Sequence, residues 1–238
     1  MHSNRYTLFF VFIITVVLGT LLSVTKENLK VKQEDNLRAD VNKTILRSLK
    51  FKEDENNPWS NEKVEEIFNN SIMALCVDSE GNKIDNVVLE EIDIEKDIER
   101  LPVYLKVIED ELQGVALPVA GKGLWSTLFG YIALGPDLDT VLGIQFYKHG
   151  ETPGLGGEVE KEWFTDNFIG KKIRNVEGEI IGIKVLKGKV DDSKEDAIHQ
   201  VDGISGATVT SNGVTIFLKD DLKRYEAYLN KIKENGII

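Results

Sequence analysis

The chain contains a single cysteine, Cys76, among its 238 residues. One cysteine excludes an intramolecular disulfide, and it excludes iron–sulfur or zinc clusters built from several thiolates of this chain. Histidine is almost as scarce, with three residues, and no His-x-x-x-His or Cys-x-x-Cys pair is present to hold a metal ion. The sequence therefore predicts no metal site and leaves the redox compartment open.

Positive charge is also in short supply. The 29 lysine and arginine residues are outnumbered by 40 aspartate and glutamate residues, and the formal net charge is -11. Nucleic acid selects basic surfaces, so this balance argues against a nucleic-acid-binding protein. The sequence also lacks a Gly-x-x-x-x-Gly-Lys-Ser/Thr loop and a Gly-x-Gly-x-x-Gly turn followed by a helix. Nucleotide binding through either motif is therefore unsupported.

Apolar residues are plentiful, at 42% of the chain, which is enough for a real core. The length suits one domain of ordinary size with an appendage. That appendage is an uncharged run from Tyr6 to Thr25, bounded by Arg5 and Lys26. Its length matches the roughly 20 residues that cross a bilayer core.

The apolar run favours an uncleaved membrane anchor over a cleaved signal peptide. A signal peptide has a shorter apolar core, of about 7–15 residues, and a small-residue cleavage site. Here the run ends in Leu-Ser-Val-Thr-Lys, which is a poor cleavage site. Local positive charge does not settle the orientation. Because a short tail before a first apolar segment normally stays in the cytoplasm, we expect a cytoplasmic tail (1–5), a transmembrane helix (6–25) and a large domain outside the cytoplasm.

Residues 26–60 are expected to form a charged juxtamembrane helix and linker. Apolar residues recur there at every fourth position and share one helical face: Leu37, Val41, Ile45 and Leu49. The pattern ends near Asn57-Pro58. Residues 61–238 then form the main domain.

The main domain is rich in short apolar runs separated by turn residues. Strands are predicted at residues 72–77, 86–92, 103–108, 114–120, 128–134, 141–146 and 179–186, and helical periodicity at 62–68. The spacing leaves little room for crossover helices except at 159–168. The last element is an amphipathic helix whose apolar stripe is interrupted only by Asp221. The predicted fold is α+β, with a mainly antiparallel sheet and flanking helices.

The tract from Asp202 to Thr210 is the most informative stretch for chemistry. Gly206 and Ala207 add almost no bulk, so a phosphate could approach the backbone closely. Thr210 and Ser211 stand just before the terminal helix and are natural caps for it. Free N–H groups and the helix dipole would stabilise a phosphate oxygen there. The simpler alternative is that these hydroxyls only cap a helix after a glycine turn.

Ser205 is a weak candidate for a nucleophile. The residues around it, Gly203-Ile204-Ser205-Gly206-Ala207, lack the second glycine of a Gly-x-Ser-x-Gly elbow. His149 and His199 are the histidines of the main domain, and nothing in the sequence places either beside Ser205.

The same tract resembles the flavinylation signature Asp-x-x-Ser/Thr-Gly-Ala-Ser/Thr-x-Thr of the FMN-binding domain family. The resemblance implies that a flavin transferase uses FAD to esterify FMN through its phosphate to Thr210. It implies that Asp202 is recognised by that transferase. It also places Ser205, Gly206, Ala207 and Thr208 among the cofactor-binding residues.

Two further stretches resemble the same family. Residues 121–126 are similar to its Gly-x-Gly-Leu-Trp segment, and residues 149–156 to its Glu-Thr-Pro-Gly-Leu-Gly loop. A flavin ring needs apolar contact on its faces and a few polar groups at its edge. Trp125, Leu124 and Leu155 could supply the faces, and Glu151 and Thr152 the edge. The alternative for Trp125 is an ordinary core aromatic.

With the N-terminal anchor included, the resemblance covers nearly the whole chain and extends to the family of the C subunit of the sodium-translocating NADH:quinone oxidoreductase. It implies an FMN-carrying electron-transfer subunit with no independent catalytic activity. The complex as a whole would couple NADH oxidation and quinone reduction to sodium export. The implied location is the bacterial inner membrane, with a single pass and the globular domain on the periplasmic side.

The resemblance also implies partners: the other proteins of a six-subunit complex, especially its B, D and E subunits, and the flavin transferase during maturation. Two alternatives stay open. One is the G subunit of the related Rnf ferredoxin:NAD oxidoreductase complex, which has the same flavin linkage and anchor. The other is a membrane-anchored scaffold without redox activity.

Overall fold

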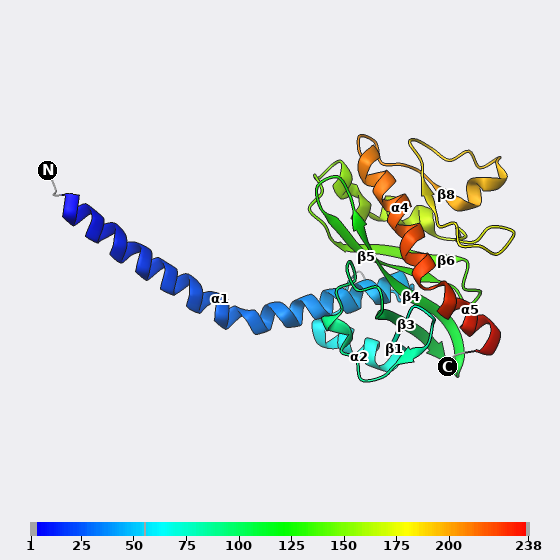
Figure 1. Ribbon diagram of the computed structural model, residues 1–238, viewed down its shortest axis with the longest axis horizontal. Helices are drawn as coiled ribbons and strands as arrows, with labels where there is room; N and C mark the ends of the chain where they lie inside the picture. The colour runs from blue at the N-terminus through cyan, green and yellow to red at the C-terminus, as the bar shows by residue number, and fades with distance from the viewer. Residues whose placement is uncertain (1–3, 55, 237–238) are drawn as a thin grey trace. The chain divides into compact units, whose positions relative to one another are not determined.

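The computed structural model describes residues 4–54 and 56–236 (Figure 1). Contacts divide the chain into two units within its first helix, α1 (Asn4–Ser48), after Asp40. The first unit is the N-terminal part of α1. Among the described residues, one helical stretch, Asn4–Lys30, is long and apolar enough to cross a membrane, and none of its apolar window is buried within the protein.

Three threonine hydroxyls in this stretch are satisfied within the helix. The hydroxyls of Thr15, Thr20 and Thr25 each donate to the carbonyl oxygen four residues earlier, at 2.8 Å. Such bonds within one helix are what a segment in lipid requires, because a bilayer core offers no water to its polar groups.

The second unit is built on one antiparallel sheet. Within the described residues it has six strands in the order β2 (Lys83–Ile84), β1 (Ile72–Val77), β3 (Leu101–Ile108), β4 (Glu111–Lys122), β5 (Thr127–Leu134) and β6 (Val141–Lys148). Every neighbouring pair is antiparallel, which confirms the predicted fold class. Glu109 and Asp110 join β3 to β4 with φ of 51° and 63°, the left-handed turn that suits the twist of a hairpin.

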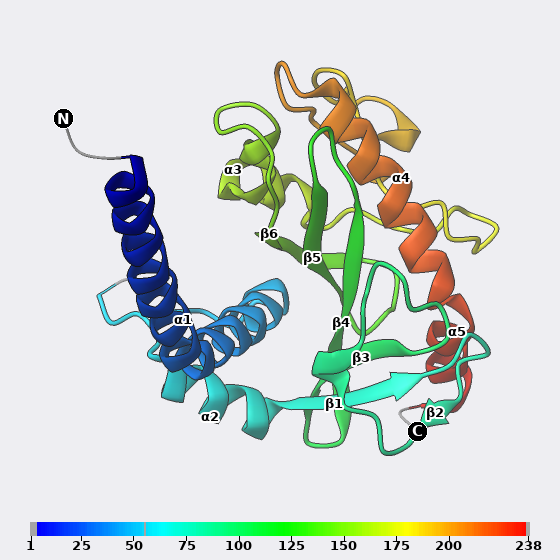
Figure 2. The same ribbon diagram turned by 60° about the vertical axis from the view of Figure 1, so that its left-hand side comes forward.

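Both faces of the sheet are covered, and Figures 1 and 2 show α4 (Thr208–Arg224) running across one of them. This face holds the larger core, to which α4 and α5 (Glu226–Asn235) contribute Phe217, Leu222 and Leu229. The opposite face packs against Ile45 and Leu49 and against the region of α2 (Asn61–Ser71). Coverage on both sides explains why the middle of β4 is buried at seven successive positions.

Close approach of backbones sets the position of α4 on β4. A Cβ on Gly213 would lie 2.1 Å from the carbonyl oxygen of Lys122, and one on Gly121 would lie 2.2 Å from the Cβ of Phe217. The buried Asp221 carboxylate accepts from the Ala120 amide at 2.8 Å. These contacts fix how far α4 extends along β4, and therefore where its N-terminus lies.

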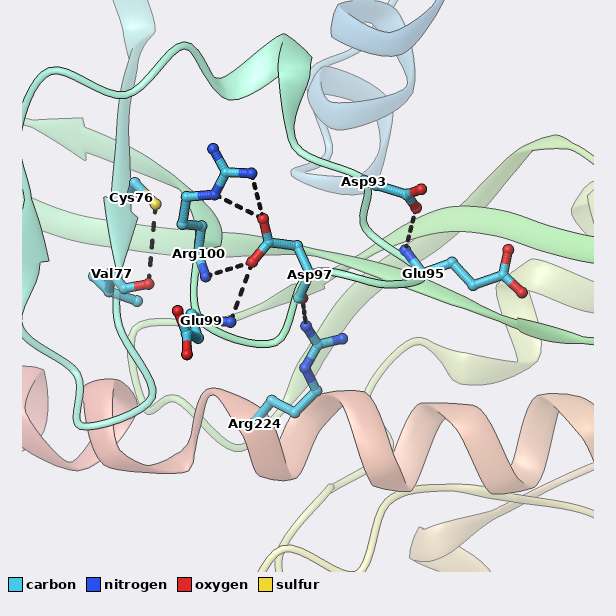
Figure 3. A network of polar contacts seen from close by, with 8 residues as sticks. All are labelled: Cys76, Val77, Asp93, Glu95, Asp97, Glu99, Arg100 and Arg224. Carbon is cyan, nitrogen blue, oxygen red and sulfur yellow. Dashed lines mark hydrogen bonds and ion pairs between the residues drawn. The ribbon is translucent and has the colours of Figure 1, made fainter.

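A polar network then ties the loop before β3 to α4 (Figure 3). Arg224 donates to the main-chain oxygens of Asp97 and Ile94 and pairs with Asp221 at 3.3 Å. The Asp97 carboxylate accepts from the Arg100 guanidinium at 2.7 Å. Burial raises the pKa of Asp221 to about 6, although the Ala120 amide and Arg224 both act to lower it.

Several predicted elements are wrong in detail. Residues 86–92 contain the short 3-10 helix η1 (Leu89–Glu91) instead of a strand. Residues 179–186 give only β7 (Lys184–Val185), which pairs in parallel with β8 (Gln200–Val201). Positive φ at Gly178 and Gly182, of 84° and 73°, turns the chain where a strand would have to stay extended.

The helical predictions also need correction. Residues 159–168 fall in three short pieces: η2 (Gly156–Glu160), α3 (Glu162–Thr165) and η3 (Asp166–Phe168). A further short helix, η4 (Glu195–His199), precedes β8. The terminal helix begins at Thr208 and breaks at Tyr225 into α4 and α5. The apolar helical face predicted within residues 26–60 is only partly buried, because Leu37 is exposed whereas Ile45 and Leu49 are buried.

Candidate functional site

Thr210 lies in the first turn of α4 and is 1% exposed. The expectation that Thr210 and Ser211 cap the helix from outside is wrong. The N-cap is Ala207, which makes no side-chain cap bond, and the first helical bond runs from the Ser211 amide to the Ala207 oxygen at 2.9 Å. The first amides of the turn therefore have no partner within the helix, which favours an anion there.

The Thr210 hydroxyl is bonded to a carboxylate 59 residues earlier in the chain. Its Oγ1 donates to Oε2 of Glu151 at 2.6 Å. Glu151 is itself only 5% exposed, so both partners are shielded from solvent. The structure thus brings together the two motifs that the sequence placed in separate segments.

Glu151 is held by the turn between β4 and β5. Three successive amides donate to its carboxylate: Leu124 at 3.2 Å, Trp125 at 2.8 Å and Ser126 at 3.1 Å. The turn is closed by the Gly123 amide, which donates to the Ser126 oxygen at 2.8 Å. Successive amides of a turn form an anion-binding concavity, and here the anion is a side chain of the protein itself.

These bonds decide the charge of Glu151. Burial alone would raise its pKa, but hydrogen bonds from the Thr210 hydroxyl and from the three amides outweigh burial and hold the pKa below its ordinary value. Four donors satisfy the carboxylate, as a buried charge requires. Glu151 is therefore ionised at neutral pH and presents a fixed oxygen to Thr210.

Glycine residues leave room for this pair. A Cβ on Gly156 would lie 2.5 Å from Glu151 Oε2 and 2.7 Å from Thr210 Oγ1. A Cβ on Gly123 would lie 2.7 Å from Glu151 Oε1. These distances are shorter than real contacts of a methyl group, so both positions admit only glycine without displacement of the pair.

The segments that contact the buried pair or adjoin it carry exposed apolar side chains. Trp125 is 71% exposed, Leu124 52% and Leu155 43%, so Trp125 is not a core aromatic. Thr152 is exposed on the same loop as Leu155. Leu155 adjoins the other motif, because a Cβ on Gly206 would lie 2.8 Å from its Cδ2. Three segments thus present accessible side chains around Thr210.

The remaining predicted residues lie just before α4 and at its first position. Ser205 and Thr208 are exposed, Ala207 is buried, and Gly206 adopts a φ of 75° that favours glycine. Asp202 is half-buried and accepts from the Val190 amide through Oδ1 at 2.7 Å. This bond gives Asp202 a structural contact that the sequence did not indicate.

One residue of the site was expected only as a helix cap, and two others were not singled out by sequence. The first is Ser211, whose hydroxyl is buried and has no hydrogen-bond partner among the described residues. Val209 is exposed between Thr208 and Thr210. The hydroxyl of Ser126, which accepts from the Gly150 amide at 2.6 Å, joins the two middle motifs.

Other candidate sites have less support than the Thr210–Glu151 pair. An open cavity of about 650 Å³ contains none of the predicted residues, and its walls mix charges such as Asp137, Lys172 and Arg174. Across residues 4–54 and 56–236, no group of three or more potential ligands could hold a metal ion. The residues that the sequence predicts for the site therefore lie near the Thr210–Glu151 pair and not in this cavity.

Known proteins are similar to this chain in the same region and beyond it. The profile of the FMN-binding domain matches residues 123–223, which include Glu151 and Thr210. The C subunit of the Na(+)-translocating NADH-quinone reductase of Pseudomonas aeruginosa is 46% identical over 134 residues, covering 54% of this chain and 51% of that protein. The chain thus spans about half the length of that relative.

Two longer matches extend the similarity. The protein of the same name from Vibrio anguillarum is 33% identical over 260 residues, covering 99% of this chain and 97% of that protein. The crystal structure of the corresponding protein from Parabacteroides distasonis superposes with a TM-score of 0.71 at 33% identity, covering 84% of this chain and 96% of that one. The chain therefore belongs to the family of the C subunit of the Na(+)-translocating NADH-quinone reductase.

Proposed function

We propose that the chain carries one FMN esterified through its phosphate to Thr210 and serves as an electron-transfer subunit of a membrane NADH:quinone oxidoreductase that exports sodium. The observation that carries the proposal is the Thr210 hydroxyl, placed in an uncapped first helical turn and bonded to the ionised Glu151. Family membership supports the electron-transfer role and disfavours the G subunit of the Rnf complex.

The residues present fit a phosphate ester. The first turn of α4 offers amides without helical partners, and the buried Ser211 hydroxyl beside Thr210 is an unmatched polar group within the described residues. A phosphodiester carries one negative charge at neutral pH, so the helix N-terminus suffices without an arginine clamp. Exposed Ser205 and Thr208 could bond to the same group.

The ring would lie against the exposed apolar side chains. Trp125, Leu124 and Leu155 are accessible on the segments next to the Thr210–Glu151 pair, and the exposed Thr152 could add a polar group at the ring edge. When bound, FMN supplies one-electron chemistry, and the protein's part is to hold the ring and tune its environment. Asp202 is the proposed recognition residue for the flavin transferase.

The remaining proposals concern membrane and partners. We assign residues 1–5 to a cytoplasmic tail, 6–25 to the membrane, 26–60 to a juxtamembrane segment and 61–238 to the FMN-binding domain on the periplasmic side. Covalent attachment would prevent loss of FMN there, where no FMN pool replaces it. The proposed partners are the B, D and E subunits of the complex.

Mass spectrometry of the protein isolated from its membrane tests the proposal. The peptide that contains Thr210 should carry the mass of one FMN less one water, and fragmentation should place that mass on Thr210. An unmodified peptide in every preparation would overturn the proposal and favour a scaffold without redox activity.

A further inference from the structure

We infer that Glu151 is a catalytic residue in the chain's own flavinylation: it orients the Thr210 hydroxyl and takes its proton when the ester forms. The inference rests on the proposed attachment of FMN at Thr210. It adds a chemical role for a second residue, which the signature around Thr210 does not contain.

Geometry is the first support. The Thr210 Oγ1 and Glu151 Oε2 atoms are 2.6 Å apart, within the reach that proton transfer requires. The Leu124 amide also donates to Oε2, and the Trp125 amide donates to Oε1. These amides prevent the carboxylate from rotating, so its oxygen stays on the hydroxyl.

Charge is the second support. The bonds that Glu151 accepts hold its pKa below the ordinary value despite burial, so the carboxylate is ionised at neutral pH and its oxygen is open to a proton. The ionisable neighbour on its own loop is His149, whose Nδ1 accepts from the Glu151 amide at 3.2 Å. The other ring nitrogen of His149 lies 3.2 Å from Glu160 Oε2. Neither neighbour lies between Glu151 and the hydroxyl.

The covalent step balances without any redox change. The oxygen of Thr210 forms a bond to the FMN-side phosphorus of FAD, supplied by the transferase. The bond from that phosphorus to the bridging oxygen breaks, and AMP leaves with the electron pair. The proton of Thr210 moves to Glu151. A phosphodiester and a carboxylate would otherwise face each other as two negative charges, so transfer of the proton also relieves their repulsion.

The competing role for Glu151 is purely structural. Its bonds to the three amides of residues 124–126 could serve only to hold that turn. A structural role predicts lower stability in variants but no change in the pH dependence of labelling. Proton transfer predicts that the pH dependence of labelling changes when the carboxylate is removed and stays parental when a carboxylate is kept.

The test uses the full chain in detergent, purified transferase and FAD. The readout is the rate at which a flavin-fluorescent band forms after denaturation, measured between about pH 6 and pH 9. Glu151→Gln should slow labelling by about a hundredfold or more, the usual contribution of a general base. The parent-to-variant ratio of rates should fall as pH rises, because hydroxide replaces the missing base. The ratio cancels any titration of the transferase.

Two further variants keep the result decisive. Glu160→Gln removes an exposed carboxylate from the end of the nearby helix η2 and should label at the parent rate. Glu151→Asp keeps the charge but shortens the reach by one methylene, so it should slow labelling while the pH profile stays parental. Heat denaturation of each variant separates misfolding from slow chemistry. If Glu151→Gln does not fold, Glu151→Asp decides through its rate and stability together: slow labelling at parental stability supports proton transfer, whereas slow labelling that follows a loss of stability supports a structural role.

The outcomes separate this inference from the proposed function. If the parent is never labelled, the attachment proposal fails. If the parent is labelled and Glu151→Gln labels at the same rate, or with a ratio that does not change with pH, Glu151 is not the proton acceptor. A folded Glu151→Asp with the parent rate would overturn the inference as well.

Discussion

Replacing Gly156 by alanine should disturb the Thr210–Glu151 pair directly. The added methyl group would lie 2.5 Å from the carboxylate oxygen and 2.7 Å from the hydroxyl oxygen, so at least one partner must move. Gly156 is not among the glycines with positive φ, so alanine meets no backbone strain and the cost is steric. Overpacking of this kind costs about 1–3 kcal/mol.

That cost converts into a measurable change. For a domain of this size, each kcal/mol lowers the melting temperature by about 2–4 °C, so Gly156→Ala should melt about 2–12 °C below the parent. Labelling by the transferase should slow as well, because the hydroxyl and carboxylate no longer keep their 2.6 Å contact. Calorimetry and the fluorescent-band assay measure the two effects in the same preparation.

Gly135→Ala is the matched control. Its methyl group would meet the side-chain oxygen of exposed Asp137 at 3.3 Å, far from the pair. It should label at the parent rate and melt within a few degrees of the parent, because alanine also reduces the entropy of the unfolded chain. If Gly156→Ala matches this control in both measurements, the packing argument around Thr210 is refuted.

The remaining predictions concern two other carboxylates. Burial raises the pKa of Asp221 from 3.8 to about 6, so the folded protein binds this proton more tightly than the unfolded chain does. The free energy of unfolding should therefore fall by up to about 3 kcal/mol as pH rises from about 4 to about 6. Asp221→Asn should remove that slope in denaturation curves taken across this pH range, and a slope that persists would implicate other groups. Asp202→Asn keeps an oxygen for the Val190 amide but removes the charge, so it should fold like the parent yet label slowly. Asp202→Ala should also lose stability, and a parental labelling rate in Asp202→Asn would leave Asp202 a structural role alone.

Short apolar runs and the turn residues between them were sufficient to predict most of the sheet. Strand β1 lies at the predicted residues, and β3 to β6 lie within a few residues of their predicted bounds. The prediction failed where a strand-like composition sits between glycines with positive φ, as at Gly178 and Gly182. A pattern of residue types does not show which backbone torsions a glycine adopts in the folded chain.

The site was predictable in its parts but not in their contacts. The tract up to Thr210 marks a helix start, and the composition around Trp125 and Leu155 suggests an apolar pocket. Nothing local shows that Glu151 meets Thr210, because 59 residues separate them and the sheet brings them together. The exposure of Trp125 and the bond from Val190 to Asp202 likewise depend on tertiary packing.

The proposed bond between FMN and the hydroxyl oxygen of Thr210 can be tested on one gel. The parent, Thr210→Val and Thr208→Ser are each expressed with a flavin transferase, denatured and separated. Thr208 is exposed two residues away, and serine keeps the hydroxyl that the signature requires there, so Thr208→Ser controls for changes in the tract. A fluorescent band is expected in the parent and in Thr208→Ser and none in Thr210→Val. A band that persists in Thr210→Val would contradict the proposed bond.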